Sequence, residues 1–73
     1  MPLSLSRQLT ARESQVAELL LKGLSNQEIE RTLHIAPGTL KTHTSHIYAK
    51  LGIGGRQKLL LLALGEEQNS DTN

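Results

Sequence analysis

Apolar residues along the chain recur at the spacing of an α-helix. Val16, Ala17 and Leu20 would share one face of a first helix, because residues three and four apart lie together when the chain turns by about 100° per residue. Phenylalanine and tryptophan are absent and β-branched residues are sparse, which disfavours long strands. We therefore expect an all-α fold, a four-helix bundle.

Polar residues and glycine mark the ends of the first two helices. Thr10 followed by Glu13, and Ser25 followed by Glu28, fit capping boxes, in which the hydroxyl accepts a backbone N–H bond and the glutamate reaches back to the cap. Gly23 is placed to end the first helix in the left-handed conformation. The second helix is therefore expected directly after the first.

The second helix is short, with Ile29 and Leu33 as its buried pair, and a third is expected over residues 37–51. Pro37 suits its first position, since the fixed φ and missing N–H of proline fit there, and Gly52 would stop it. Its buried stripe comprises Leu40, Thr44, Ile47 and Leu51. Its opposite face comprises Lys41, Thr42, Ser45, His46 and Ala49.

A fourth helix is expected from Gly55 or Arg56 to Gly65. Its inner stripe would be Leu59, Leu60 and Ala63, which leaves Leu61 and Leu62 pointing outward. Residues 66–73, "EEQNSDTN", have little to bury and predict a disordered acidic tail. The chain thus divides into an N-terminal extension (1–8), a helical domain (9–65) and this tail.

The net charge of +1 conceals an uneven distribution. Residues 1–30 sum to −1, and the tail contributes −3. From Arg31 to Gly65 there is no acid, and the cations of that segment are Arg31, Lys41, Lys50, Arg56 and Lys58. A solvated basic face and a surface for a polyanion both fit this pattern.

Two short helices joined by a tight turn, with a basic and polar outer face on the second, form a helix-turn-helix. A helix about 10 to 12 Å across fits the major groove of B-DNA, and phosphates would repel carboxylates on the inserted face. Lysine can donate hydrogen bonds to guanine, whereas the hydroxyl groups of threonine and serine can either donate or accept them. The absence of acids over 37–51 therefore favours double-stranded DNA as the partner.

A long ordered pattern in the chain resembles a known family. "LTARESQVAELLLKGLSNQEIERTLHIAPGTLKTHTSHIYAKLGIGGR" is similar to the pattern LTxRExEVLxLxxxGxSNxEIAxxLxISxxTVKxHxxxIxxKLGVxxR of the LuxR/NarL/FixJ type of DNA-binding domain, which has four helices and no wing. The resemblance covers about Leu9 to Ala63. It implies a LuxR C-terminal-like fold and the DNA-binding domain of a bacterial transcription regulator.

Residue roles follow from the resemblance by position. It implies that Lys41, Thr42 and Ser45 read base edges. The DNA backbone contacts are expected from Asn26, Thr39, His43, His46, Lys50 and Arg56. The last helix would form the dimer contact through Leu61 and Leu62.

The chain departs from the family pattern at several positions, among them Glu30, Ala36, Ser45 and the pair Gly54-Gly55. Glu30 stands where alanine is usual, at a close helix crossing, so its carboxylate must reach solvent or a cation. Ala36 replaces the serine before the third helix, which removes an N-cap oxygen worth about 1 kcal/mol.

The resemblance also implies partners beyond DNA. A second copy of the chain, RNA polymerase and an N-terminal regulatory domain are expected, and the chain fits either an excised C-terminal domain or a free-standing regulator. Cysteine is absent, which suits a reducing, cytoplasmic compartment. The longest apolar run, residues 59–64, is far shorter than the roughly 20 residues of a membrane helix. No membrane contact is expected.

Other functions remain open at this point. His43 and His46 could suggest a metal, but no cysteine or neighbouring carboxylate completes a ligand set, and no cofactor is expected. We do not expect an enzyme, because the sequence offers no nucleophile paired with a base and no phosphate loop. The main alternative is a helix-turn-helix that contacts a protein, with Glu30, Leu61 and Leu62 as its working surface.

Overall fold

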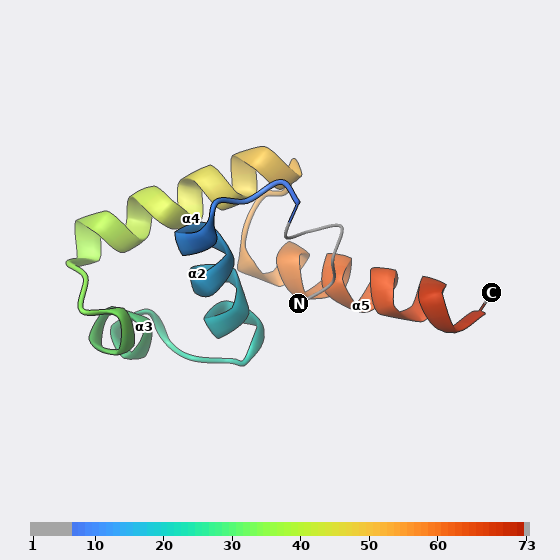
Figure 1. The fold of residues 1–73 in the computed structure, drawn as a ribbon, viewed down its shortest axis with the longest axis horizontal. Coiled ribbons are helices and arrows are strands. Elements are labelled where there is room, and N and C mark those ends of the chain that lie inside the picture. Colours follow the sequence, from blue (N-terminus) through green and yellow to red (C-terminus); the bar gives the residue numbers. More distant parts are fainter. Residues whose placement is uncertain (1–6, 73) are drawn as a thin grey trace.

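The computed structural model describes the backbone of residues 7–72 and the side chains of residues 7–65. It confirms the all-α prediction (Figure 1), and in this part of the chain the helices are α2 (Ala11–Leu21), α3 (Asn26–Leu33), α4 (Pro37–Leu51) and α5 (Arg56–Thr72). Helix α2 packs against all three other helices, and α3 also packs against α4. None of the described helices combines the length and apolar character needed to span a membrane.

Both predicted capping boxes are present. Thr10 Oγ1 accepts a hydrogen bond from the Glu13 N–H at 3.2 Å, and Glu13 Oε1 accepts one from the Thr10 N–H at 3.0 Å. The corresponding distances are 3.2 Å and 2.8 Å for the Ser25 and Glu28 pair. Each box satisfies two backbone donors that the first turn of a helix leaves without a partner.

Three helices end in the same way. Gly23 and Gly52 have positive φ values of 92° and 68°, as the sequence predicts for Gly23. His34 ends α3 in the left-handed conformation with φ 56°, which the sequence analysis missed because side chains rarely favour that region. The residue that follows each of these three positions packs against the core. These residues are Leu24, Ile35 and Ile53, and all three are half-buried.

The hydrogen bonds around these three residues form Schellman motifs. The N–H of Leu24, Ile35 and Ile53 donates to a carbonyl five residues earlier, at 3.2, 3.0 and 2.9 Å. Such a bond satisfies a terminal carbonyl and places an apolar residue over the last turn. The turn between α3 and α4 is therefore held by backbone bonds and by the burial of Ile35.

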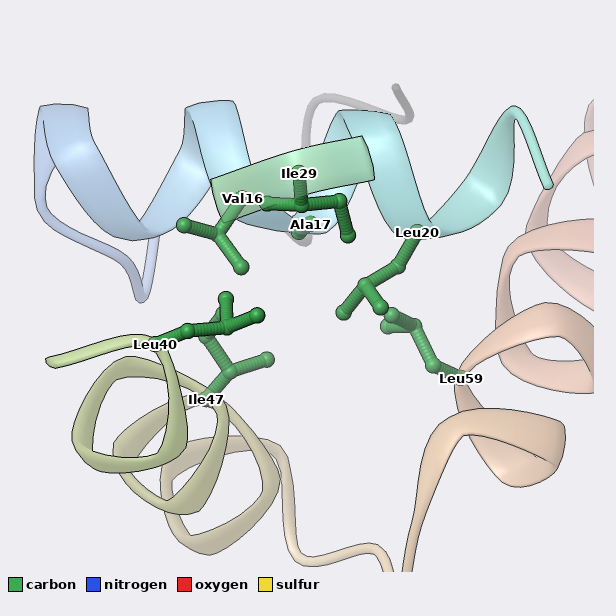
Figure 2. Packing of buried hydrophobic residues seen from close by; sticks show 7 residues of the cluster. All are labelled: Val16, Ala17, Leu20, Ile29, Leu40, Ile47 and Leu59. Atoms are coloured by element: carbon green, nitrogen blue, oxygen red, sulfur yellow. The ribbon is translucent and has the colours of Figure 1, made fainter. Parts of the chain in front are cut away.

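Seven buried side chains form the core. Val16, Ala17, Leu20, Ile29, Leu40, Ile47 and Leu59 are each no more than 2% exposed. Figure 2 shows these side chains converging from all four helices. The two buried residues of α4 belong to the stripe that its sequence predicts, so the rotation of α4 about its own axis is fixed by the core.

Helix α5 differs from its prediction. It runs to Thr72 instead of ending at Gly65, and Gly65 is not among the residues with positive φ, so it does not act as a left-handed cap. Glutamate and glutamine after it are good helix formers. The predicted disordered tail therefore falls on backbone that is helical up to Thr72, and the side chains of residues 66–73 lie outside the described part.

The outward-facing residues of α5 also need a correction. Leu61 is 59% exposed, as predicted, but Leu62 is only half-buried and Leu64 is 54% exposed. Leu62 stands three residues after the buried Leu59, so it lies beside the inner stripe, whereas Leu64 stands three after Leu61 and extends the outer one. Most of the predicted N-terminal extension, residues 1–6, lies outside the described residues.

Candidate nucleic-acid interface

One face of α4 is exposed and carries no acid. Leu40 and Ile47 turn inward at 2% and 0% exposure. The exposed residues of the opposite face are those that the sequence predicts there: Lys41, Thr42, Ser45, His46 and Ala49. Because the core fixes the rotation of α4, these side chains are presented together on a rigid element.

The three predicted base-reading residues differ in their present bonds. Thr42 Oγ1 donates to the carbonyl of Gly38 at 3.1 Å, which uses its proton but leaves the oxygen able to accept and the methyl exposed. Ser45 is exposed. Lys41 has no ion-pair partner in the part of the chain whose side chains are described, so its ammonium group is available to a ligand.

Three of the predicted backbone contacts lie near helix starts or on the flank of α4. Asn26 is the first residue of α3, and Thr39 lies in the first turn of α4; both are exposed. His43 is half-buried. The unpaired N–H groups in a first turn attract anions, so Asn26 and Thr39 occupy positions that suit a phosphate.

Lys50 and His46 share a partner on α2, Glu13, for which the sequence predicts only a capping role. Lys50 Nζ donates to Glu13 Oε1 at 2.6 Å, and His46 Nδ1 lies 3.6 Å from Glu13 Oε2. The Glu13 side chain is 5% exposed, compared with 39% for Lys50 and 60% for His46. The hydrogen bond from Lys50, followed by that from the Thr10 N–H, lowers the pKa of Glu13 against the opposing effect of burial.

Arg56 is also engaged within the protein. Its Nη2 donates to the Leu20 carbonyl at 3.0 Å, near the end of α2, where cationic side chains satisfy terminal carbonyls. Burial raises the pKa of Tyr48, and the positive charge of Arg56 partly opposes that rise. Arg56 thus joins the start of α5 to the end of α2, a role that no local sequence signal indicates.

Helices α2 and α3 contain acids, whereas α4 contains none. The carboxylates of α2 and α3 are Glu13, Glu18, Glu28 and Glu30, whereas the charged and polar side chains of α4 are those of lysine, histidine, threonine, serine and tyrosine. Glu30 is half-buried and makes no ion pair among the described residues. No three metal-binding side chains gather in the described part of the chain.

A short helix, a tight turn and a second helix whose outer face is exposed, polar and basic define the class of helix-turn-helix domains. Comparison with known proteins agrees. The family model described as bacterial regulatory proteins, luxR family, matches residues 7–63. The chain belongs to the luxR family of bacterial regulatory proteins.

Two relatives illustrate the relationship. A protein of Aeromonas salmonicida named "Putative HTH-type transcriptional regulator in exeN 3'region" is 52% identical over 56 residues, which cover 77% of this chain and 29% of that protein. The HTH-type transcriptional regulator MalT of Vibrio campbellii is 42% identical over 55 residues, covering 75% of this chain and 6% of MalT. The chain therefore spans less than a third of the length of either relative.

Proposed function

We propose that α4 binds in the major groove of double-stranded DNA and that the chain serves as the DNA-binding domain of a transcriptional regulator. The observation that carries this proposal is the outer face of α4, which is exposed, free of acids and fixed in rotation by Leu40 and Ile47. A helix of this diameter fits the groove. The two relatives are named as HTH-type transcriptional regulators, and these names support the same function.

Lys41, Thr42 and Ser45 are the proposed base-reading residues. A lysine can donate to O6 and N7 of guanine, a serine can bond either way, and the threonine methyl can contact that of thymine. Ala49 adds no bulk on the same face, which allows the backbone to approach closely. The readout would therefore depend on one cation and short polar groups.

Phosphate contacts are proposed for Asn26, Thr39 and His43, with His46 at the flank because its side chain remains 60% exposed. Lys50 and Arg56 are left out of this set. Lys50 would have to exchange Glu13 for a phosphate, and Arg56 would have to release the Leu20 carbonyl. Each exchange costs a hydrogen bond involving a charged group.

We also propose that the chain forms a homodimer through α5. Leu61 and Leu64 lie on one face of this helix and are both more than half exposed, and paired apolar residues of this kind mark association surfaces. A symmetric dimer would bind two half-sites about 10 bp apart. We further propose that the chain contacts RNA polymerase, is attached to an N-terminal regulatory domain and acts in the cytoplasm.

The exposed leucines also favour a second candidate, a domain that contacts another protein without DNA. Apolar burial responds weakly to salt, whereas DNA binding weakens steeply as salt rises because counterions are released. A partner whose affinity is insensitive to salt, together with no binding to any duplex, would support this second function.

Selection of bound duplexes from a random pool tests the first function. We expect a recovered consensus of two half-sites, since a specific reader enriches particular base pairs. Affinity for the consensus duplex should fall steeply between low and moderate salt. Recovery of unenriched sequence at every round would contradict base reading by α4.

A further inference from the structure

A buried carboxylate connects α2 to the flank of α4. Glu13 is the one buried charged residue among the described side chains, at 4% exposure. Its Oε1 accepts from Lys50 Nζ at 2.6 Å and from the Thr10 N–H at 3.0 Å, while Oε2 lies 3.6 Å from His46 Nδ1. No sequence-local requirement explains the Lys50 contact, because the capping box of α2 is complete without it.

The pairing changes the charge that α4 presents. Lys41 and Lys50 are the lysines of this helix, and an ammonium 2.6 Å from a carboxylate carries its counter-charge within the protein. A lysine increases the salt dependence of DNA binding when it neutralises a phosphate and releases a counterion. Lys50 cannot do so while Glu13 holds it.

Phosphate contacts position a protein on any duplex, whereas base contacts discriminate among sequences. An additional phosphate contact would strengthen binding to all duplexes alike. Withholding one therefore leaves a larger share of the binding free energy to the base-reading residues, Lys41, Thr42 and Ser45.

We propose that Glu13 is a specificity-setting residue, which holds Lys50 away from phosphates and so weakens the binding of α4 to DNA of any sequence. This inference rests on the proposed function of α4. Glu13 acts through Lys50 and touches no base or phosphate itself, so it is a positioning residue.

The test compares the wild-type chain with Glu13→Gln, Lys50→Gln and the double variant. Glutamine suits the last position of a capping box as well as glutamate does, so Glu13→Gln removes the charge and keeps the cap. The measurement is the dissociation constant for a duplex of scrambled sequence, followed by fluorescence anisotropy over a series of salt concentrations. Circular dichroism confirms the helix content of each variant.

We expect Glu13→Gln to steepen the plot of log affinity against log salt by about 0.9, the value of one additional phosphate contact. For proteins that bind equally at about 1 M salt, this change of slope corresponds to roughly eightfold tighter binding to scrambled duplex at about 0.1 M salt. Lys50→Gln alone should leave the wild-type slope unchanged. The double variant should show the wild-type slope again, because it lacks the Lys50 side chain that Glu13→Gln would free for a phosphate.

Three results would overturn the inference while leaving the function of α4 intact. These are an unchanged slope in Glu13→Gln, a shallower slope in Lys50→Gln, and a slope that stays steep in the double variant. If Glu13→Gln does not fold, Lys50→Gln still tests the inference. A shallower salt slope in Lys50→Gln than in the wild type would mean that Lys50 already contacts a phosphate. Failure of the wild-type chain to bind any duplex would instead contradict the proposed function.

Discussion

Lys41 and Lys50 stand on the same helix in different surroundings. Lys41 is exposed on the acid-free face, whereas Lys50 is bound to Glu13. The sequence identifies both as cations of α4, but it does not reveal that one of them has a partner 37 residues away. A long-range pair of this kind depends on how α2 crosses α4, which local patterns do not specify.

Lys41→Ala should weaken binding to the selected duplex by about 1 to 3 kcal/mol and relax the preference at one base position. The physical reason is the loss of the donor to guanine, which a methyl group cannot replace. Titrations with the selected duplex and with single-base variants measure both effects. Lys22→Ala, at an exposed lysine at the end of α2, is the matched control, and an equal loss there would argue against base reading by Lys41.

Glu13 should make stability depend on pH. Folding lowers its pKa below the ordinary value of 4.5, mainly through the Lys50 hydrogen bond, so the unfolded chain binds a proton more readily than the folded one. The stabilisation is therefore present above about pH 4.5 and is lost as the pH falls through the lowered folded value.

Glu13→Gln should lower the free energy of unfolding at pH 7 by about 1 to 3 kcal/mol, because Lys50 loses its charged partner, and should flatten the decline in acid. Urea unfolding at a series of pH values measures this. Glu28→Gln is the control. Glu28 also occupies a capping box, where hydrogen bonds with Ser25 lower its pKa, but this box is exposed and contains no lysine partner. A steeper acid decline in Glu13→Gln than in the wild type would contradict the account.

The helix ends show how far local sequence determines structure. Both capping boxes and the glycine end of α2 are predicted correctly, because those signals depend on residues within one turn. The left-handed His34 and the end of α5 at Thr72 are missed. At His34 the burial of Ile35 outweighs the local preference of the side chain, and at Gly65 a glycine continues the helix instead of ending it.

The start of α4 offers a stabilising substitution. Ala36 has the extended backbone of an N-cap, with φ −75° and ψ 156°, but supplies no side-chain oxygen. Ala36→Ser should let a hydroxyl accept the Thr39 N–H and stabilise the fold by about 1 kcal/mol. That gain corresponds to a rise in Tm of about 4 to 8 °C for a domain of this size.

Thermal unfolding followed by circular dichroism measures this change. Ser25→Ala provides the reciprocal case, because it removes an N-cap oxygen already bonded to the Glu28 N–H, and its Tm should fall by a similar amount. A lower Tm for Ala36→Ser would show that the hydroxyl does not reach the first turn of α4.

At the scale of the whole molecule, the core and the two candidate surfaces lie on different parts of the bundle. The second half of α5 extends away from the other helices (Figure 1), and Leu61 and Leu64, which precede it on the same helix, are exposed. The sequence predicts the existence of this apolar face but misplaces one member, because a run of consecutive leucines gives no clear period. The core contact of Leu59 decides which leucines point outward.

Leu61→Glu should shift the chain from dimer to monomer, since an unpaired carboxylate cannot be buried in an apolar interface without a large cost. Sedimentation velocity at increasing protein concentration measures the oligomeric state. Gln15→Glu adds the same charge at an exposed position of α2 and should leave the dimer intact. A wild-type chain that stays monomeric at high concentration and on DNA would contradict the dimer proposal, and Leu62 is a poorer test because it is half-buried.

The most direct test of the account is the response of backbone amide signals when a consensus duplex is titrated into the labelled protein at low ionic strength. We expect the largest changes from Thr39 to Ala49, above all at Lys41, Thr42 and Ser45, and little change along α5 apart from dimer contacts. Unmoved signals along α4, or changes confined to α5, would contradict the account.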